Sequence, residues 1–374
     1  MSPVTVGRIL QVIDGLAPFR LAESWDNVGL LVGDLQAPVR RLAVALEITP
    51  DLLPEIRDRG IDLLITHHPP IFQPLRQVTT QRPESAMVYE LARMGAALIA
   101  AHTNLDASPW GTNAALAERF ALQALAPLFP MPLRSAPYKL VIYTPEGAEQ
   151  EIIAAIARGG GGVIGRYDHC SFRAQGVGTY RPLDGATPWA GEVGQLEQAP
   201  EWRIEAEVPA RALPDVFNEV RQAHPYEKMA YDLYPRVQPD PLYSMGLTGV
   251  LPFEMTLAAL ARRVRDRLPG GEPVAFIGDG EQPIVRAAVF AGSGKMAIRD
   301  WAGQADALIT GEVDHHLARD AEARGMAVIA AGHYATEQPV AGFFAKRLQE
   351  EPLIRDNGIE TLALETLVSP FQAL

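Results

Sequence analysis

Two blocks of the chain alternate short, wholly apolar runs with helix-patterned segments, and this rhythm constrains the fold most. In the first block we predict strands at Leu42–Ile48, Leu63–Thr66 and Ala96–Ala101, and helices at Val4–Phe19, Pro54–Arg59, Ser85–Met94 and Asn113–Leu122. In the second we predict strands at Val274–Ile277, Ala287–Ala291, Ala307–Thr310 and Ala327–Ala331, and helices at Thr256–Leu268, Ala297–Ala302, His315–Arg324 and Val340–Gln349. Strands that are apolar throughout are typical of partly parallel sheets covered by helices on both faces. The two blocks therefore predict two halves of one α/β unit.

A segment of about a hundred residues with a different pattern separates the blocks. Proline-rich stretches at Pro127–Pro137 and Pro235–Pro241 bound it, and we interpret both as linkers. Inside it we predict, in order, strand Tyr138–Tyr143, helix Ala148–Ala157, strands Phe172–Tyr180 and Trp202–Val208, helix Leu213–Ala223 and strand Tyr231–Tyr234. This order is the ferredoxin-like split βαβ pattern. We therefore expect outer segments at 1–130 and 240–374 and an inserted α+β domain at 137–237.

Composition excludes several classes of protein. The net charge of −12 over 374 residues disfavours a general nucleic-acid-binding surface, although a local basic groove stays open. No apolar run approaches the roughly 18 residues of a membrane span, and the N-terminus lacks a signal-peptide layout, so we expect a cytoplasmic protein. The single cysteine, Cys170, excludes intramolecular disulfides and thiolate-rich metal sites.

Six of the eight histidines lie just after predicted strands of the outer segments. His67 and His68 follow one strand and His102 follows the next. In the second block His315 and His316 come shortly after one strand, and His333 comes after another. Because the carboxyl ends of strands line the binding crevice of open α/β sheets, we expect these imidazoles at one rim.

Carboxylates accompany two of these histidines. Asp106 lies four residues after His102, and Glu337 lies four after His333, so a helical turn would bring each pair to one side. Imidazole and carboxylate ligands without sulfur suit Zn, Mn, Fe, Ni or Co. A carboxylate can bridge two such ions, which then activate one water. Each motif alone has an ordinary alternative, such as a solvated helix pair, or Asp106 capping the helix near Thr112.

Three further segments leave alternatives open. Ser24-Trp-Asp-Asn27 either supports the site through Asp26 or Asn27 or forms only a turn. Phe290–Lys295 predicts a tight strand-to-helix turn, with phosphate binding as the minority interpretation. Tyr226 and Glu227, after His224-Pro225, form either a site in the insert or a loop.

These motifs together resemble the NIF3-like family, also called GTP cyclohydrolase 1 type 2 homologues. The matching stretches are Ser24–Leu30, Thr66–Phe72, Ala101–Ala107, Thr310–Glu312 and Gly332–Glu337, and they span both outer segments in order. His224–Pro235 resembles the His-Pro-Tyr-Glu segment of the PII-like domain inserted in longer bacterial members. The resemblance implies a two-lobed α/β unit with mixed sheets, interrupted by an inserted ferredoxin-like, PII-like domain.

The resemblance also implies a site with two divalent metal ions per chain. Its ligands would be His67, His68, Asp106, His333 and Glu337, with Glu337 bridging the ions. His102 and Glu312 match positions that line the site, and we expect them to be catalytic, Glu312 as a supporting or proton-transfer group. The family likeness further implies a ring-like homohexamer.

We therefore expect a dinuclear metal-dependent hydrolase that acts on a nucleotide through a metal-bridging hydroxide, with GTP cyclohydrolase-type activity as one form. No P-loop is present, and the net acidity gives triphosphate recognition no support. The alternative is a metal-binding regulatory or scaffold protein whose PII-like insert senses a small ligand. No membrane partner is expected, and nucleic acid is disfavoured.

Overall fold

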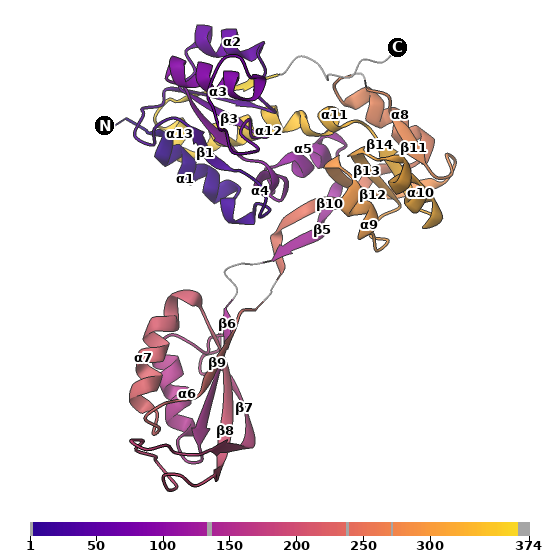
Figure 1. Ribbon diagram of the computed structural model, residues 1–374. Helices are drawn as coiled ribbons and strands as arrows, with labels where there is room; N and C mark the ends of the chain where they lie inside the picture. The colour runs from indigo at the N-terminus through magenta and orange to yellow at the C-terminus, as the bar shows by residue number, and fades with distance from the viewer. Residues whose placement is uncertain (1–2, 133–136, 237–238, 271, 366–374) are drawn as a thin grey trace. The chain divides into compact units, whose positions relative to one another are not determined.

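The computed structural model describes residues 3–132, 137–236, 239–270 and 272–365 (Figure 1). The chain forms two compact units, an outer unit (Met1–Met131 with Asp240–Leu374) and an inserted unit (Pro132–Pro239). In the described residues, no helix combines the length and apolar character that a membrane crossing requires.

The outer unit contains two sheets, of which the first has five strands in the order β1-β4-β3-β2-β15. Their bounds are β1 Gly29–Val32, β4 Ala97–Ala100, β3 Leu63–Thr66, β2 Arg41–Ala45 and β15 Glu360–Leu364. All neighbours are parallel except β1 and β4. Alternate residues of β2 enter different cores: Leu42 and Val44 face one and Ala43 and Ala45 the other. Burial on both faces explains why these strands are apolar throughout.

Helices cover both faces of this first sheet. They are α1 Val6–Leu16, α2 Leu52–Arg59, α3 Pro83–Met94, α12 Pro339–Glu350 and α13 Pro352–Arg355, with a 3₁₀ turn at Phe19–Leu21. Ile9 and Ile13 of α1 share a core with Phe344 of α12, whereas Ile56 of α2 and Leu91 of α3 lie in the other.

The second sheet has six strands in the order β11-β14-β13-β12-β10-β5. Their bounds are β11 Ala275–Ile277, β14 Ala327–Ala330, β13 Ala307–Glu312, β12 Pro283–Ser293, β10 Pro239–Thr256 and β5 Gln123–Pro132. Strands β12, β13 and β14 are parallel, and β10 and β11 pair antiparallel with them. The helices of this half are α5 Thr112–Arg119, α8 Leu257–Arg267, α9 Lys295–Arg299 and α10 His315–Ala323.

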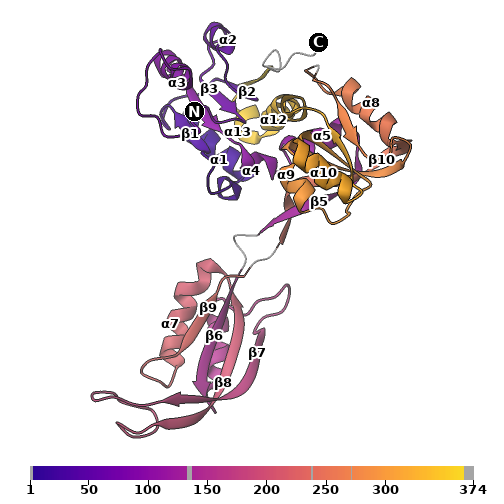
Figure 2. The ribbon, with the colours of Figure 1, turned by 45° about the vertical axis from the view of Figure 1, so that its right-hand side comes forward.

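The two outer segments exchange strands, which ties the sheets together. Strand β15, near the C-terminus, pairs with β2 of the first segment, and β5 of the first segment joins the second sheet. Helix α12 packs on β2 and β15 and also touches α5 (Figure 2). The short helices α4 (Thr103–Asp106) and α11 (His333–Glu337) lie where the sheets meet.

Strands β5 and β10 correct the prediction that the proline-rich stretches are linkers. β5 runs through Pro127 and Pro130 to Pro132, and β10 begins at Pro239. Because β5 is the edge strand, a proline that cannot donate a backbone hydrogen bond is tolerated there. Residues 133–136 and 237–238 lie outside the described part of the chain. The sequence patterns also failed to indicate β1 and β15.

The inserted unit is a four-stranded antiparallel sheet with two helices. The elements are β6 Tyr138–Pro145, α6 Glu149–Arg158, β7 Ser171–Tyr180, β8 Glu197–Val208, a 3₁₀ turn at Ala210–Ala212, α7 Leu213–Ala223 and β9 Tyr231–Tyr234. The predicted order of strands and helices is therefore observed. The strands lie in the order β7-β8-β6-β9, and residues of α6 and α7 pack with β6 and β8 in one core.

Candidate metal centre

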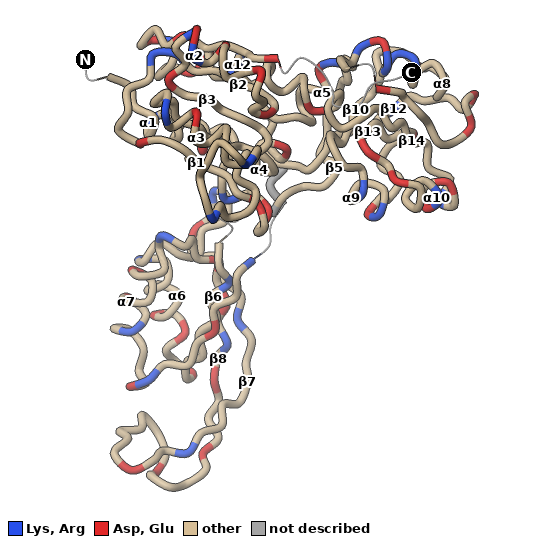
Figure 3. Tube along the Cα trace, turned by 45° about the horizontal axis from the view of Figure 1, so that its top comes forward, with Lys and Arg blue, Asp and Glu red and all other residues tan. Residues whose placement is uncertain are grey.

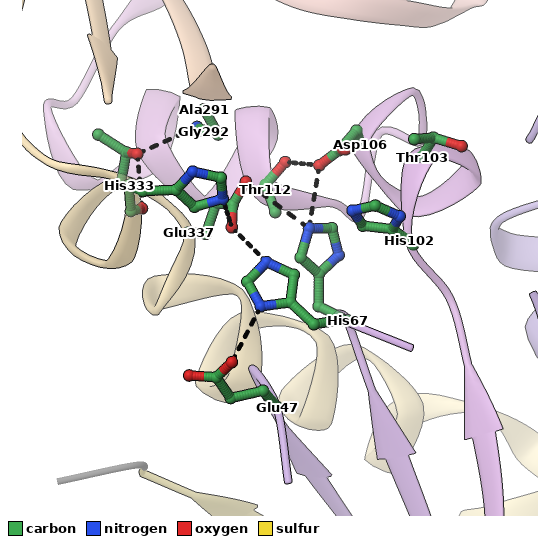
Figure 4. A network of polar contacts seen from close by, with 12 residues as sticks. Glu47, His67, His102, Thr103, Asp106, Thr112, Ala291, Gly292, His333 and Glu337 are labelled. Carbon is green, nitrogen blue, oxygen red and sulfur yellow. Dashed lines mark hydrogen bonds and ion pairs between the residues drawn. The ribbon is translucent and has the colours of Figure 1, made fainter. Parts of the chain in front are cut away.

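Four histidines from the two sheets of the outer unit meet at one point (Figure 4). His67 and His68 directly follow β3, His102 follows β4, and His333 begins α11 after β14. Ring centroids lie 5.0 Å apart for His67 and His102, and 5.6 Å apart for His68 and His333. Strand ends of both sheets thus deliver imidazoles to the same place, as the spacing predicted for these four.

The carboxylate of Glu337 lies at the centre of this group and is almost fully buried. Its Oε2 lies 2.8 Å from His68 Nε2 and 3.0 Å from His333 Nε2. Its Oε1 lies 3.9 Å from His67 Nε2, which is also 3.5 Å from Asp106 Oδ1. The two oxygens of one carboxylate therefore face two different sets of possible ligands.

The other ring nitrogen of each histidine has its own partner. His67 Nδ1 donates to Ala101 O at 3.1 Å, and His102 Nδ1 contacts Asp26 Oδ1 at 2.9 Å. His68 Nδ1 and His333 Nδ1 each lie 3.3 Å from a carboxylate oxygen, of Glu47 and Glu312 respectively. Such partners hold the rings in orientation and direct Nε2 into the site, an arrangement typical of metal-ligating histidines.

Asp106 does not cap the next helix. Helix α5 begins at Thr112, and its N-cap residue Gly111 makes no side-chain capping bond. Instead the Thr112 hydroxyl donates to Asp106 Oδ1, and Asn113 Nδ2 donates to the Asp106 carbonyl at 2.9 Å. These contacts hold the Asp106 carboxylate toward His67. The alternative that Asp106 only caps the helix near Thr112 is therefore wrong.

The Phe290–Lys295 segment contains the predicted tight turn, since β12 ends at Ser293 and α9 begins at Lys295, and the segment contacts the site. Gly292 has a φ of +67°, and a Cβ built there would lie 2.2 Å from Glu337 Oε1. Its N–H donates to Thr336 Oγ1 at 3.1 Å. Only glycine allows the backbone to pass so close to the central carboxylate.

The turn at Ser24–Asn27 also supports the site. The side chain of Asp26 is buried, and it accepts hydrogen bonds from the Thr103 N–H and hydroxyl at 3.0 and 2.5 Å besides contacting His102. Burial disfavours its charge, but the bonds from His102 and Thr103 outweigh it and lower its pKa to about 2. Asn27 Nδ2 donates to Ile71 O, in the loop that follows His68.

Charge coupling around Glu337 shifts the pKa of its neighbours. Burial disfavours the His68 cation, but hydrogen bonds to Glu337 and Glu47 outweigh it and raise the His68 pKa to about 10. The hydrogen bond to Glu337 raises the His333 pKa to about 9. Burial opposes ionisation of Glu337, yet its three histidine partners hold its pKa well below the ordinary value. Burial raises the pKa of Asp106.

The residues present fit a metal ion. His67 Nε2 is buried without a hydrogen-bond partner, which is costly unless another group binds it. Among the described residues, two clusters have ligand atoms close enough to share an ion, His67–His68–His102 and His68–His333–Glu337. Both offer imidazole nitrogen, and the second adds a carboxylate, a donor set that suits first-row divalent metals.

His315 and His316 do not join the site, so the prediction of six histidines at one rim was wrong for these two. Strand β13 ends at Glu312, and Asp314 then caps α10 by accepting from Leu317 N at 2.9 Å. The helix therefore starts at His315, and both imidazoles are exposed to solvent.

Sequence reasoning missed Glu47, which orients His68, and Thr112, which binds Asp106. The predicted strand Leu42–Ile48 placed Glu47 inside a strand, whereas β2 ends at Ala45. The histidines were predicted as polar side chains that come just after a buried strand. Had the strand been predicted to end at Ala45, the same reasoning would have indicated Glu47. No comparable signal marks Thr112.

A family profile described as Duf34/NIF3 (NGG1p interacting factor 3) matches residues 4–369 of this chain. A Bacillus subtilis protein named "GTP cyclohydrolase 1 type 2 homolog" is 35% identical over 371 residues, which cover 98% of each chain. A Mycobacterium tuberculosis protein of the same name is 35% identical, with 92% of each chain covered. Among solved structures, a Bacillus cereus protein related to NIF3 is similar over 100% of both chains, with 31% identity and a TM-score of 0.70.

Proposed function

This chain belongs to the Duf34/NIF3 family, and we propose that it holds two divalent metal ions and uses them to hydrolyse a nucleotide. The observation that carries the proposal is the position of Glu337, whose two carboxylate oxygens face separate sets of ligands. His67 and Asp106 would hold one ion and His68 and His333 the other, with Glu337 shared.

When bound, such ions supply an activated water and neutralise developing negative charge. The residues of the chain then orient the substrate and transfer protons to and from it. Asp26 fixes the His102 ring through Nδ1, so that Nε2 is the nitrogen available to move a proton at the reacting atom. Glu312 acts through His333, whose ring it positions.

The first test is metal content after purification without a chelator and without a nickel affinity step. We expect about two ions per chain in the wild type, and loss of metal in His68→Ala and Glu337→Ala. A variant that replaces both His315 and His316 by alanine is the matched control, since these residues also form a His-His pair but lie outside the site, and it should keep its metal. A wild type that takes up no Mn, Fe or Zn would contradict the proposal.

The nucleotide substrate is proposed from the name of the relatives and from the hydrolytic chemistry of such a site. The test is turnover of GTP and other nucleotides by the metal-loaded protein. His102→Ala is the variant expected to lose proton transfer, and its metal content is measured alongside, because His102 also lies within reach of an ion. Removal of a general acid–base group lowers the rate by about 10²- to 10⁴-fold. Equal turnover in wild type and His102→Ala would remove His102 from the mechanism.

We further propose that the protein is cytoplasmic and assembles as a homohexamer. Size-exclusion chromatography with light scattering would test the hexamer.

A second candidate function is regulation through the inserted unit, for which we propose a PII-like role in sensing a small ligand. A pocket of about 490 Å³ is lined by Tyr226 and Glu227, with Trp189 and Glu201 also in its wall. The Tyr226 hydroxyl donates to Glu201 at 2.9 Å, and the rings of Trp189 and Tyr226 lie 6.1 Å apart.

Metabolite mixtures should protect the inserted unit from hydrogen exchange in the wild type and not in Trp189→Ala. Ligand binding that changes turnover at the metal centre would favour a regulator. If Trp189→Ala changes turnover under no condition, the inserted unit does not regulate the metal centre.

A further inference from the structure

We propose that Trp25 and Phe72 form a stacking platform for the ring of a mononucleotide, whose phosphate is held by Arg76 and Arg82. The inference rests on the proposed function, because it names the class of ligand that would reach the metal centre. It assigns a role to aromatic side chains that the metal site itself does not use.

The two rings are large apolar groups left open to solvent. Trp25 is 57% exposed and Phe72 47% exposed, and their ring centroids lie 5.8 Å apart with planes tilted by 52°. Exposed aromatic surface of this kind marks binding sites. Aromatic side chains are the usual surface on which nucleobases stack, because every base has a π-face.

The loops that carry these rings are held in place. Asp26, next to Trp25, is buried against His102 and Thr103, and Asn27 Nδ2 donates to Ile71 O, next to Phe72. The exposure of the rings is therefore not the result of a loosely attached loop. A platform whose geometry is set before binding loses less entropy when a ligand arrives.

The platform adjoins the metal centre through one imidazole. The His102 and Trp25 ring centroids lie 6.1 Å apart with planes at 74°, and the His102 and His67 ring centroids lie 5.0 Å apart. A flat ring stacked on Trp25 would thus lie beside His102, the residue proposed to move a proton.

A place for an anion adjoins Phe72. Phe72, Arg76 and Arg82 line one pocket of about 370 Å³, which also includes Gln73 and Gln77. Neither arginine has an ion-pair partner among the residues that the structure describes. Guanidinium groups bind phosphate with two parallel hydrogen bonds. Because Phe72 belongs to both features, one ligand with a ring and a phosphate could occupy both.

Figure 3 shows Lys and Arg interspersed with Asp and Glu along the chain. The protein as a whole is acidic, with a net charge of −12, so it does not attract anions in general. Arg76 and Arg82, without ion-pair partners among the described residues and close to two aromatic rings, therefore favour a phosphorylated ring compound over a long polyanion.

Binding of GMP, guanosine and ribose 5-phosphate to the metal-loaded full chain tests the proposal by calorimetry. We expect Trp25→Ala to weaken GMP and guanosine at least tenfold and to leave ribose 5-phosphate unchanged. Replacing both Arg76 and Arg82 by alanine should weaken GMP and ribose 5-phosphate and spare guanosine. Trp25→Phe should restore most of the affinity, and Phe253→Ala, which removes an equally exposed ring elsewhere, should change nothing.

The outcomes separate the two proposals. If the wild type takes up no metal, the proposed function is contradicted. If the metal-loaded wild type and Trp25→Ala bind GMP equally well, the stacking platform alone is overturned. Metal-loaded wild type that binds no GMP would overturn the platform too. If Trp25→Ala changes the oligomeric state measured by light scattering and leaves GMP affinity intact, the rings belong to a subunit interface, and the platform is likewise excluded.

Discussion

At the scale of single residues, Glu337 organises the candidate metal centre. Its carboxylate keeps protons on His68 and His333, whose pKa values rise to about 10 and about 9. Metal ligands must be deprotonated, so an ion and these protons compete for the same nitrogens. The acid–base state of the site is therefore coupled to metal binding.

Metal uptake should release about two protons per chain at pH 7, one each from His68 and His333. Apparent metal affinity should consequently rise with pH until it levels off near pH 9 to 10. Calorimetry in buffers of different ionisation enthalpy measures the number of protons released. Glu337→Gln should reduce that number, and metal binding without proton release would contradict the coupling.

The same shifts predict how the metal-free protein responds to alkali. Both folded-state pKa values lie above the ordinary histidine value of 6.5, so their contribution to the free energy of unfolding is complete below pH 6.5. It is lost as the pH rises through about 9 to 10. Denaturant unfolding of the metal-free protein at pH 6 and pH 10 measures the loss, and Glu337→Gln should diminish this pH dependence. An unchanged difference in the variant would assign it to other groups.

Gly292 should tolerate no side chain. In Gly292→Ala, we expect a backbone cost of about 1–2 kcal/mol from the left-handed conformation, together with loss of metal as the methyl group displaces Glu337. Gly303→Ala is the matched control: its φ is +76°, but a Cβ there meets nothing within 4 Å. Both variants should lose stability in denaturant unfolding, and only Gly292→Ala should lose metal. Equal metal content would show that Glu337 adjusts freely.

At the scale of elements, the start of α10 decides which histidines reach the site. Its N-cap Asp314 accepts from Leu317 N and places His315 and His316 on an exposed first turn. The strands themselves were predictable, because β3 and β9 have the predicted bounds and the apolar runs of β12–β14 were recognised. The starting points of helices after those strands were not, since one residue of extra strand or turn redirects every following side chain.

Removal of this cap should destabilise the outer unit without disturbing the metal. Asp314→Ala should lower the free energy of unfolding, because the first turn of α10 loses a hydrogen-bond acceptor. Asp314→Asn keeps an acceptor and should retain most of that stability. Denaturant unfolding measures the difference, while metal content should equal that of the wild type in both. Metal loss in Asp314→Ala would tie α10 to the site.

At the scale of the whole chain, the candidate ligands come from segments more than two hundred residues apart. His67, His68 and Asp106 belong to the first outer segment, and His333 and Glu337 belong to the second. An ion bound by both would join the two sheets and stabilise the folded state by mass action.

Metal loading should therefore raise the protection of the outer unit in hydrogen exchange, particularly in β3, β4 and α11. Residues of the inserted unit, 137–236, serve as the internal control and should be unaffected. Chelator should reverse the effect. If metal raised the hydrogen-exchange protection of both units equally, its effect would not come from binding at this centre.

The amino-acid sequence by itself determined the periodicity of most elements and the residues capable of holding a metal, because these are local properties of side-chain type and spacing. It did not determine that Pro127 and Pro130 lie in an edge strand, that β15 completes the first sheet, or that Glu47 orients His68. Only the tertiary structure decided these, since pairing of distant strands depends on which edges and faces remain available. It also placed Glu337 among three histidines from two sheets, and that juxtaposition gives the site its chemistry.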